Sequence, residues 1–167
     1  HLGRGVRRKT LADTDITGGG FPESAAACAG MEVLDAAARP FAHRYTHDLV
    51  YAVKDETALH IQLLHAWNAA EKWPLILFVP GSGWAKQKNL YAMLPQLSRL
   101  AGMGWAVGTV EYRPSDKARF PAQIEDLKSA VRFMRENAHS YGVDPDNIVL
   151  WGTSSGGHTA LMAGLSG

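Results

Sequence analysis

Residues 148–157 read Ile-Val-Leu-Trp-Gly-Thr-Ser-Ser-Gly-Gly, a short apolar run that ends in Gly-x-Ser-x-Gly with Ser154 at its centre. The residues that follow favour a helix. A strand, a tight turn and a helix in this order are the context in which the motif presents a nucleophilic serine above a sheet. Gly152 and Gly156 would let strand and helix approach closely. The hydroxyl would lie near the positive end of the helix, where an oxyanion is stabilised.

The alternative for this motif is a glycine-rich turn without chemistry, because five small residues also recur by chance. The segments before it favour the nucleophile. Two β-rich runs, residues 48–53 and 58–66, are separated by four polar residues and predict a hairpin. Continuous apolar runs at residues 74–79 and 105–110 are typical of parallel strands that are buried on both faces.

Two helical patterns connect these strands, one over residues 89–101 and a longer one that opens at Pro121. Strands that alternate with helices predict a parallel α/β sheet, in which ligands bind at the carboxyl ends of the strands. Three turns fall at that edge: residues 80–84, 111–116 and 152–156. They are predicted to converge on one site.

Composition is ordinary for a globular protein. The 167 residues are 46% hydrophobic and 20% charged, and the formal net charge of +1 argues against a nucleic-acid partner. The basic cluster at residues 4–9 is interpreted as a solvated tail. Cys28 is the only cysteine, which excludes an intrachain disulfide and a cysteine metal cluster. No apolar run approaches the ~20 residues of a membrane span, and we expect a cytoplasmic location.

Two regions are expected along the chain. Residues 1–46 form an amino-terminal extension, mobile over residues 1–20 and with one helix within residues 22–38. Residues 47–167 form the α/β core. Because the chain begins at His1 and shows no signal-peptide pattern, an earlier segment is expected to be missing or removed.

Four short segments together resemble the α/β-hydrolase superfamily, and most of all its esterase branch of hormone-sensitive-lipase-like carboxylesterases and acetyl-xylan or feruloyl esterase-like proteins. The segments are Val79-Pro80-Gly81-Ser82-Gly83-Trp84, Glu111-Tyr112-Arg113, Phe120-Pro121-Ala122-Gln123-Ile124-Glu125-Asp126 and Gly152-Thr153-Ser154-Ser155-Gly156-Gly157-His158. The resemblance covers about residues 47–167. It implies the amino-terminal half of an α/β-hydrolase fold, with an antiparallel hairpin followed by parallel strands and crossover helices. It also implies ester hydrolysis through an acyl-serine, with neither cofactor nor metal.

The site residues follow from these segments. Ser154 is the predicted catalytic nucleophile, and the amide of Ser155 is the first predicted oxyanion donor. The amides of Ser82 and Gly83 are expected to complete the oxyanion hole. Trp84 and Tyr112 are candidate substrate-binding residues, with packing at the sheet edge as the equal alternative.

Two departures from the family pattern bear on activity. The family's oxyanion loop often reads His-Gly-Gly-Gly-Trp, and here Pro80 and Ser82 replace the histidine and the second glycine. The serine still has an amide to donate, whereas loss of the histidine takes away the loop's usual anchor. The family's triad acid and histidine follow later strands, and neither fits between Ser154 and Gly167. The sequence therefore predicts an amino-terminal fragment that is inactive alone.

Other titratable residues receive structural interpretations. His158 is expected to pack or hydrogen-bond behind the elbow rather than act as the base. Asp126 is expected to anchor a neighbouring loop rather than serve as the triad acid, and Asp116 to cap a turn rather than contact substrate. His60 and His65, on or beside a strand, are expected to be structural or exposed.

For the intact protein, the sequence favours a serine carboxylesterase for small esters, with acetyl esters of carbohydrates as a candidate class. The alternatives are a non-catalytic hydrolase-fold binding protein and another serine hydrolase, such as a lipase or peptidase. The expected partner is a small-molecule ester. The exposed edge of a half-sheet is expected to cause aggregation or to pair with a second copy of the chain or with the missing half.

Overall fold

The computed structural model describes residues 43–88 and 90–166, so the expected extension and the helix within residues 22–38 lie outside the described residues. The elements in chain order are β1 (His43–Lys54), β2 (Thr57–Ala66), β3 (Trp73–Val79), α1 (Leu94–Ala101), β4 (Ala106–Val110), α2 (Ala122–Glu136), α3 (Ala138–Tyr141), β5 (Val143–Gly152) and α4 (Ser155–Leu165). Because β1 begins at His43, it spans the boundary expected between residues 46 and 47. The division into two regions stays a prediction.

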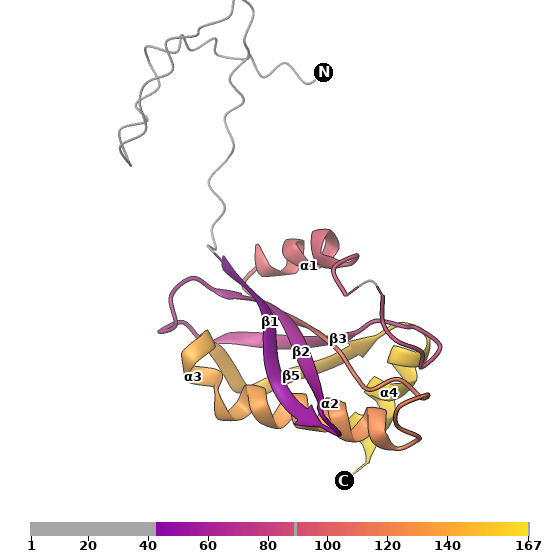
Figure 1. Ribbon diagram of the computed structural model, residues 1–167. Helices are drawn as coiled ribbons and strands as arrows, with labels where there is room; N and C mark the ends of the chain where they lie inside the picture. Colours follow the sequence, from indigo (N-terminus) through magenta and orange to yellow (C-terminus); the bar gives the residue numbers. More distant parts are fainter. Residues whose placement is uncertain (1–42, 89, 167) are drawn as a thin grey trace, which may run out of the picture. The chain divides into compact units, whose positions relative to one another are not determined.

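The strands form a five-stranded mixed sheet in the order β1-β2-β4-β3-β5 (Figure 1). β1 and β2 make the predicted antiparallel hairpin, and β2 also runs antiparallel to β4. β3 is parallel to both β4 and β5, as its continuous apolar run predicted. The carboxyl ends of β3, β4 and β5 therefore share one edge of the sheet.

Helices cover the two faces of the sheet: α1 lies on one face, and α2, α3 and α4 lie on the other (Figure 1). The alternation of β3 explains why both faces are buried. Leu75 and Leu77 belong to the larger core cluster, which includes the buried residues of α2, whereas Ile76 and Phe78 pack with Leu97 on the side of α1. A strand with two buried faces needs apolar residues at every position.

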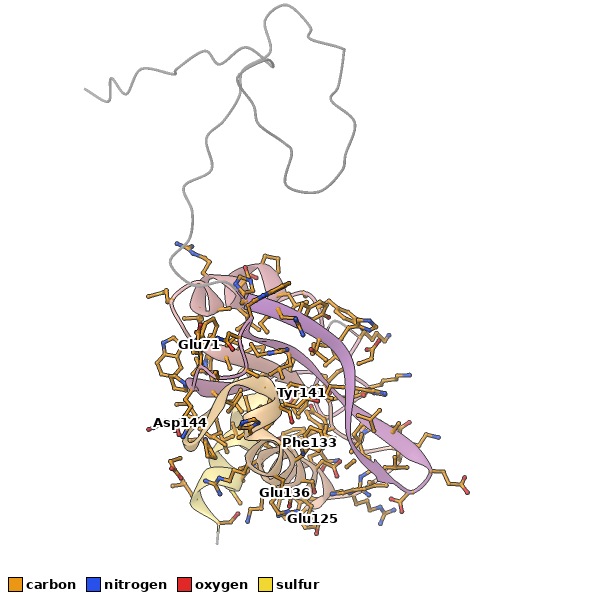
Figure 2. The ribbon with its side chains drawn as sticks, turned by 90° about the vertical axis from the view of Figure 1, so that its left-hand side faces the viewer. Glu71, Glu125, Phe133, Glu136, Tyr141 and Asp144 are labelled. Carbon is orange, nitrogen blue, oxygen red and sulfur yellow. The ribbon has the colours of Figure 1, made fainter. Side chains whose placement is uncertain are left out.

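Helix α2, the longer of the two predicted helices, buries an apolar stripe against the sheet. Ile124, Leu127 and Met134 are buried, and burial of each such side chain stabilises the fold by about 1.5–3 kcal/mol. On the opposite side of the helix, Glu125 and Glu136 point to solvent (Figure 2). The stripe fixes how α2 lies against the sheet, and with it the residues at its first turn.

The helix predicted over residues 89–101 is shorter than expected. Residues 90–93 form turns, and α1 begins at Leu94. The reason is Pro95, which a longer helix would place in its interior, where proline lacks the donor N–H and clashes with the carbonyl four residues earlier. In the first turn of the observed helix, the missing N–H has no consequence.

Strand β5 also differs from expectation, because it begins at Val143 rather than Ile148. Gly142, with a φ of 60°, ends α3 in the left-handed conformation that glycine adopts without strain. The chain can then enter the sheet at once, and Val143 pairs with Trp73 of β3. The outer side of β5 is an edge of the described sheet, and Val149 and Trp151 are exposed there. This edge is the physical basis of the self-association expected from the sequence, which stays a prediction.

His65 on β2 is a buried structural residue, as expected. Its Nε2 lies 2.9 Å from the hydroxyl of Thr46, and its ring meets Tyr141 edge-on at 5.4 Å. Burial lowers the pKa of His65, and the positive charge of Arg44 acts in the same direction. The neutral ring is therefore the form that the fold favours.

We expect the stability of the protein to fall as the pH drops below about 6.5, the pKa of an unfolded histidine. Below that pH the unfolded chain binds a proton that folded His65 resists, so the contribution of this residue is complete above pH 6.5 and is lost on acidification. Urea unfolding at pH 7.5, 6.5 and 5.5 measures this. The variant His65→Gln should show a shallower pH dependence, and parallel slopes for both proteins would contradict the interpretation.

Candidate active site

Ser154 lies between the end of β5 and the start of α4, in a strained backbone conformation. Its φ is 51° and its ψ is −126°, a combination that few residues other than glycine adopt. Such strain costs on the order of 1–3 kcal/mol and persists only where the surrounding structure enforces it. The side chain of Ser154 is exposed, as a nucleophile must be. This is the geometry that the motif predicted.

The flanking glycines are required by close contacts. A Cβ atom on Gly156 would overlap the carbonyl of Val79 on β3, and one on Gly152 would overlap the carbonyl of Gly156. A Cβ on Gly81 would lie 2.6 Å from the carbonyl oxygen of Thr153 and 2.8 Å from the Cβ of Ser154. The elbow and the loop after β3 are thus in direct contact, and two of the three turns predicted to converge do so.

The loop after β3 lies beside the serine, but its amides are not all free. The N–H of Gly81 donates to Oγ1 of Thr153 at 3.1 Å, and the N–H of Ser82 donates to Oγ of Ser155 at 3.0 Å. The amide of Ser82 can therefore donate to a substrate oxyanion only if its hydrogen bond to Ser155 breaks. Its role as a donor stays a prediction.

Two other predicted donors remain available. Within the described residues, the amides of Gly83 and Ser155 donate no hydrogen bond. Ser155 opens α4, so its N–H is one of the unpaired donors at the positive end of that helix. An anion above Ser154 would meet this amide without displacing a protein partner.

Trp84 and His158 flank the elbow on its solvent side. Trp84 is 40% exposed, and its ring meets that of His158 edge-to-face at 5.6 Å. His158 is exposed, so the expectation that it packs behind the elbow is wrong. Among the described residues, no histidine ring is hydrogen-bonded to the hydroxyl of Ser154. The exposure of Trp84 is compatible with a substrate contact, which stays a prediction.

Tyr112 does not occupy the position predicted for a substrate contact. Only 2% of it is exposed, and its hydroxyl lies 2.8 Å from Oγ of Ser82 and 3.4 Å from Oγ of Ser155. It lies behind the loop after β3. The packing alternative describes this residue better, because a side chain so deeply buried is shielded from a ligand in solvent.

Asp126 is the loop anchor that was predicted. Its buried carboxylate accepts hydrogen bonds from the backbone N–H of Arg113 at 2.9 Å, from the Arg113 guanidinium at 2.8 Å and from Nζ of Lys54 at 3.0 Å. This carboxylate raises the pKa of Arg113, which stays charged. Asp116 is exposed on the same loop. The loop after β4 is therefore held by α2.

A buried glutamine was missed from the sequence. The amide group of Gln87 donates to the carbonyls of Pro80 at 3.2 Å and Val110 at 3.3 Å, and accepts from the N–H of Tyr112 at 3.0 Å. It joins the ends of β3 and β4. A glutamine in a non-periodic loop carries no pattern that would single it out.

His60 forms a pair with Glu111, and this pair is not part of a cluster of metal ligands among the described residues. Nδ1 of His60 lies 2.7 Å from Oε2 of Glu111, which also accepts the backbone N–H of His60. The pair joins β2 to the loop after β4, in line with the structural interpretation of His60. Among residues 43–88 and 90–166, no three histidine, cysteine, aspartate or glutamate side chains gather as metal ligands would.

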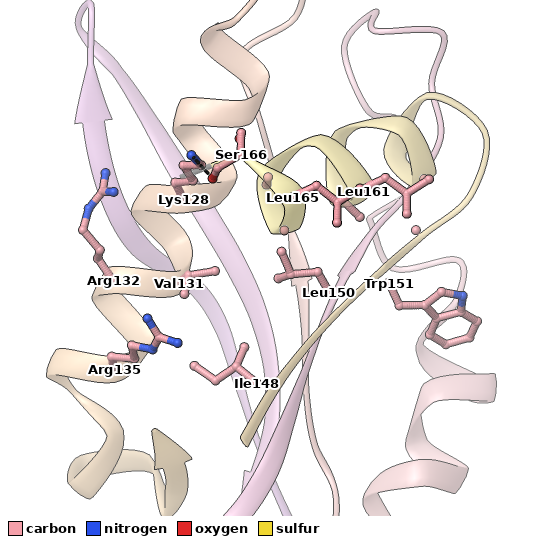
Figure 3. A pocket seen from close by; sticks show the side chains of 15 residues that line it. Lys128, Val131, Arg132, Arg135, Ile148, Leu150, Trp151, Leu161, Leu165 and Ser166 are labelled. Carbon is pink, nitrogen blue, oxygen red and sulfur yellow. Dashed lines mark hydrogen bonds between the residues drawn. The ribbon is translucent and has the colours of Figure 1, made fainter. Parts of the chain in front are cut away.

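A groove of about 880 Å³ lies beside the elbow rather than over it (Figure 3). Ile148 and Leu150 of β5 form its floor, and Arg132 and Arg135 of α2 stand along one side. Ser154 is not among the residues that line it. The groove follows the open edge of β5, so it reflects the exposed edge of the sheet and not the position of Ser154.

The sequence profile of the BD-FAE family matches residues 61–167, a range that includes the elbow, the loop after β3 and the loop anchored by Asp126. The chain belongs to the BD-FAE family. Its fold is that of the α/β-hydrolases, as the resemblance implied. Within the described part of the BD-FAE chain, no helix has the length and apolar character needed to cross a membrane.

Known esterases are similar to this BD-FAE chain. Esterase LipC of Mycobacterium tuberculosis is 34% identical over 127 residues, which are 74% of this chain and 31% of LipC. Esterase LipQ of the same organism is 38% identical over 109 residues, which are 62% of this chain and 26% of LipQ. The chain thus spans about a third or less of the length of these relatives.

The chain is also similar to an esterase of known structure. The propionate-bound esterase Est2 of Thermogutta terrifontis has a TM-score of 0.62 and 30% identity, over 72% of this chain and 44% of Est2. The BD-FAE chain therefore spans less than half of this enzyme as well.

Proposed function

We propose that this BD-FAE chain supplies the nucleophile and the oxyanion donors of a serine carboxylesterase for small esters. The observation that carries the proposal is Ser154, exposed in a strained elbow at the amino terminus of α4, with the unpaired amide of Ser155 beside it. Relatives named esterases support the class of reaction.

The reaction proceeds in two steps. Oγ of Ser154 attacks the ester carbonyl carbon while a general base takes its proton, and the carbonyl oxygen becomes an oxyanion held by the amides of Ser155 and Gly83. Collapse of this intermediate breaks the bond to the alcohol, which leaves with the proton. Water then attacks the acyl-serine by the same route, releases the carboxylic acid and restores Ser154.

We assign the base and its orienting carboxylate to segments of the whole protein beyond residues 1–167. A base must lie within hydrogen-bond reach of the serine hydroxyl, and no described histidine is bonded to it. His158 stays the alternative within the chain. Its exposed ring rests against Trp84 one helical turn after Ser154.

Short acyl groups are the proposed substrates. Est2 of Thermogutta terrifontis was solved with propionate and with butyrate bound, two small carboxylates. Acetyl esters of carbohydrates remain the candidate class for the natural substrate. The exposed Trp84 is the proposed contact, because its ring is accessible beside the elbow.

The test uses the protein expressed from its whole gene with nitrophenyl esters of acetate, butyrate and octanoate. We expect hydrolysis that is fastest with the shortest acyl groups and a loss of about 10⁴- to 10⁶-fold in Ser154→Ala. The matched control is Ser140→Ala, an exposed serine on α3, which should keep full activity.

Each other outcome favours a different function. A preference for octanoate would indicate a lipase, and cleavage of peptides instead of esters would indicate a peptidase. No turnover of any substrate, together with retained folding, would indicate a non-catalytic binding protein. Unchanged turnover in Ser154→Ala would overturn the assignment of the nucleophile.

A further inference from the structure

The two residues on either side of Ser154 both hold the loop after β3. Thr153 accepts the N–H of Gly81, and Ser155 accepts the N–H of Ser82. Two successive amides of the loop are thus bound by the two hydroxyls that flank the nucleophile. The next amide along the loop is that of Gly83, the proposed oxyanion donor, so its position follows from these two bonds.

Tyr112 supports the second of these bonds from behind. The carbonyl of Ala85 can only accept, so the hydroxyl of Ser82 donates to it at 2.7 Å. The hydroxyl of Tyr112 must therefore donate to Oγ of Ser82 at 2.8 Å. Its own oxygen then faces the hydroxyl of Ser155 at 3.4 Å, a long contact.

This arrangement is buried only on the side of Ser155 and Tyr112, since Gly81 and Thr153 are exposed, and it occurs where the chain departs from its family's pattern. Ser155 is 4% exposed and Ser82 is half-buried, so the bond between them is partly shielded from water. Pro80 stands where the family often has a histidine, and its side chain has no group that donates or accepts hydrogen bonds. The hydroxyls of Thr153, Ser155 and Tyr112 take the place of that anchor.

We propose that Thr153, Ser155 and Tyr112 are positioning residues that hold the oxyanion loop against the elbow. The proposal rests on the proposed function, because the loop matters to catalysis only if it binds an oxyanion. A displacement of about 1 Å at a catalytic group can cost about 10²-fold in rate. Loss of one hydroxyl is therefore expected to lower kcat by about 10- to 100-fold and to change KM by less than about threefold, because the donors act mainly on the transition state.

The first test is hydrogen–deuterium exchange at single-residue resolution on the protein expressed from its whole gene. We expect Thr153→Val to speed exchange at the amide of Gly81, and Ser155→Ala to speed it at the amide of Ser82. The matched control is Thr159→Val, which removes a buried hydroxyl of α4 that bonds the carbonyl of Ser155 and not the loop. Unchanged exchange at both loop amides would overturn the proposal, whether or not the protein is an esterase.

The second test is kinetic and compares Thr153→Val with Thr153→Ser. Valine keeps the shape and removes the hydroxyl, whereas serine keeps the hydroxyl, so the serine variant should restore kcat. Tyr112→Phe gives an independent variant if one of the others fails to fold, which thermal unfolding reveals. Faster loop exchange with unchanged kcat would overturn the positioning role. An absence of ester turnover in the unaltered protein would count against the proposed function. The exchange experiment would still test the loop contacts, because it does not require turnover.

Discussion

Residues 1–167 alone are expected to hydrolyse a chromogenic acetyl ester at least about 10⁴-fold more slowly than an enzyme with a complete triad. A serine hydroxyl is a poor nucleophile without a base, and the members of a triad act as a unit. In the described residues, no histidine ring is bonded to Ser154. The oxyanion donors and binding alone retain roughly 10³-fold over water.

The measurement compares the rate of ester hydrolysis by the purified chain with that of its Ser154→Ala variant. The two rates should be low and nearly equal. Turnover near that of ordinary esterases, abolished in Ser154→Ala, would contradict the prediction and place the base within residues 1–167. His158→Gln would then be the first variant to make. Its ring is exposed and lies against Trp84, one helical turn after Ser154.

The elbow could be predicted from the sequence because its signal, a short apolar run followed by the motif, is local. Gly152 and Gly156 appear in the motif for a steric reason that the structure shows directly: a Cβ at either position would overlap backbone atoms. The parallel strands were predictable for a similar reason, since the run at residues 74–79 is apolar at every position and both faces of β3 are buried. Both signals lie within a few consecutive residues.

The contacts of the loop after β3 could not be predicted, because they depend on three segments that are distant in the sequence. Ser82 bonds Ser155 and Tyr112 only after β3, β4 and β5 have been aligned in the sheet. The same holds for Tyr112 itself, because an aromatic residue just after a strand can face the core or the solvent. The start of α1 was different, since Pro95 was a local signal that the apolar periodicity of the neighbouring residues outweighed.

The loop after β4 depends on a single buried carboxylate, that of Asp126. Its two oxygens accept from the main chain and the guanidinium of Arg113 and from Nζ of Lys54. The side chain of Arg113 is 9% exposed and that of Asp126 is 0% exposed, so both charges are sheltered from water. Removal of one member of a buried ion pair leaves the other uncompensated, which is costlier than the net contribution of the intact pair.

Asp126→Ala is therefore expected to lower the free energy of unfolding by about 3–5 kcal/mol. Arg113 would keep Asp55 at 2.6 Å, but its backbone N–H and most of its guanidinium would lose their acceptor. Urea unfolding of the whole protein measures the change, with Asp116→Ala, an exposed aspartate on the same loop, as a control within about 0.5 kcal/mol of the unaltered protein. An unchanged free energy of unfolding in Asp126→Ala, together with lost ester turnover, would instead make Asp126 part of the catalytic machinery. The buried contacts with Arg113 and Lys54 oppose that outcome, because they use the lone pairs that a triad histidine would need.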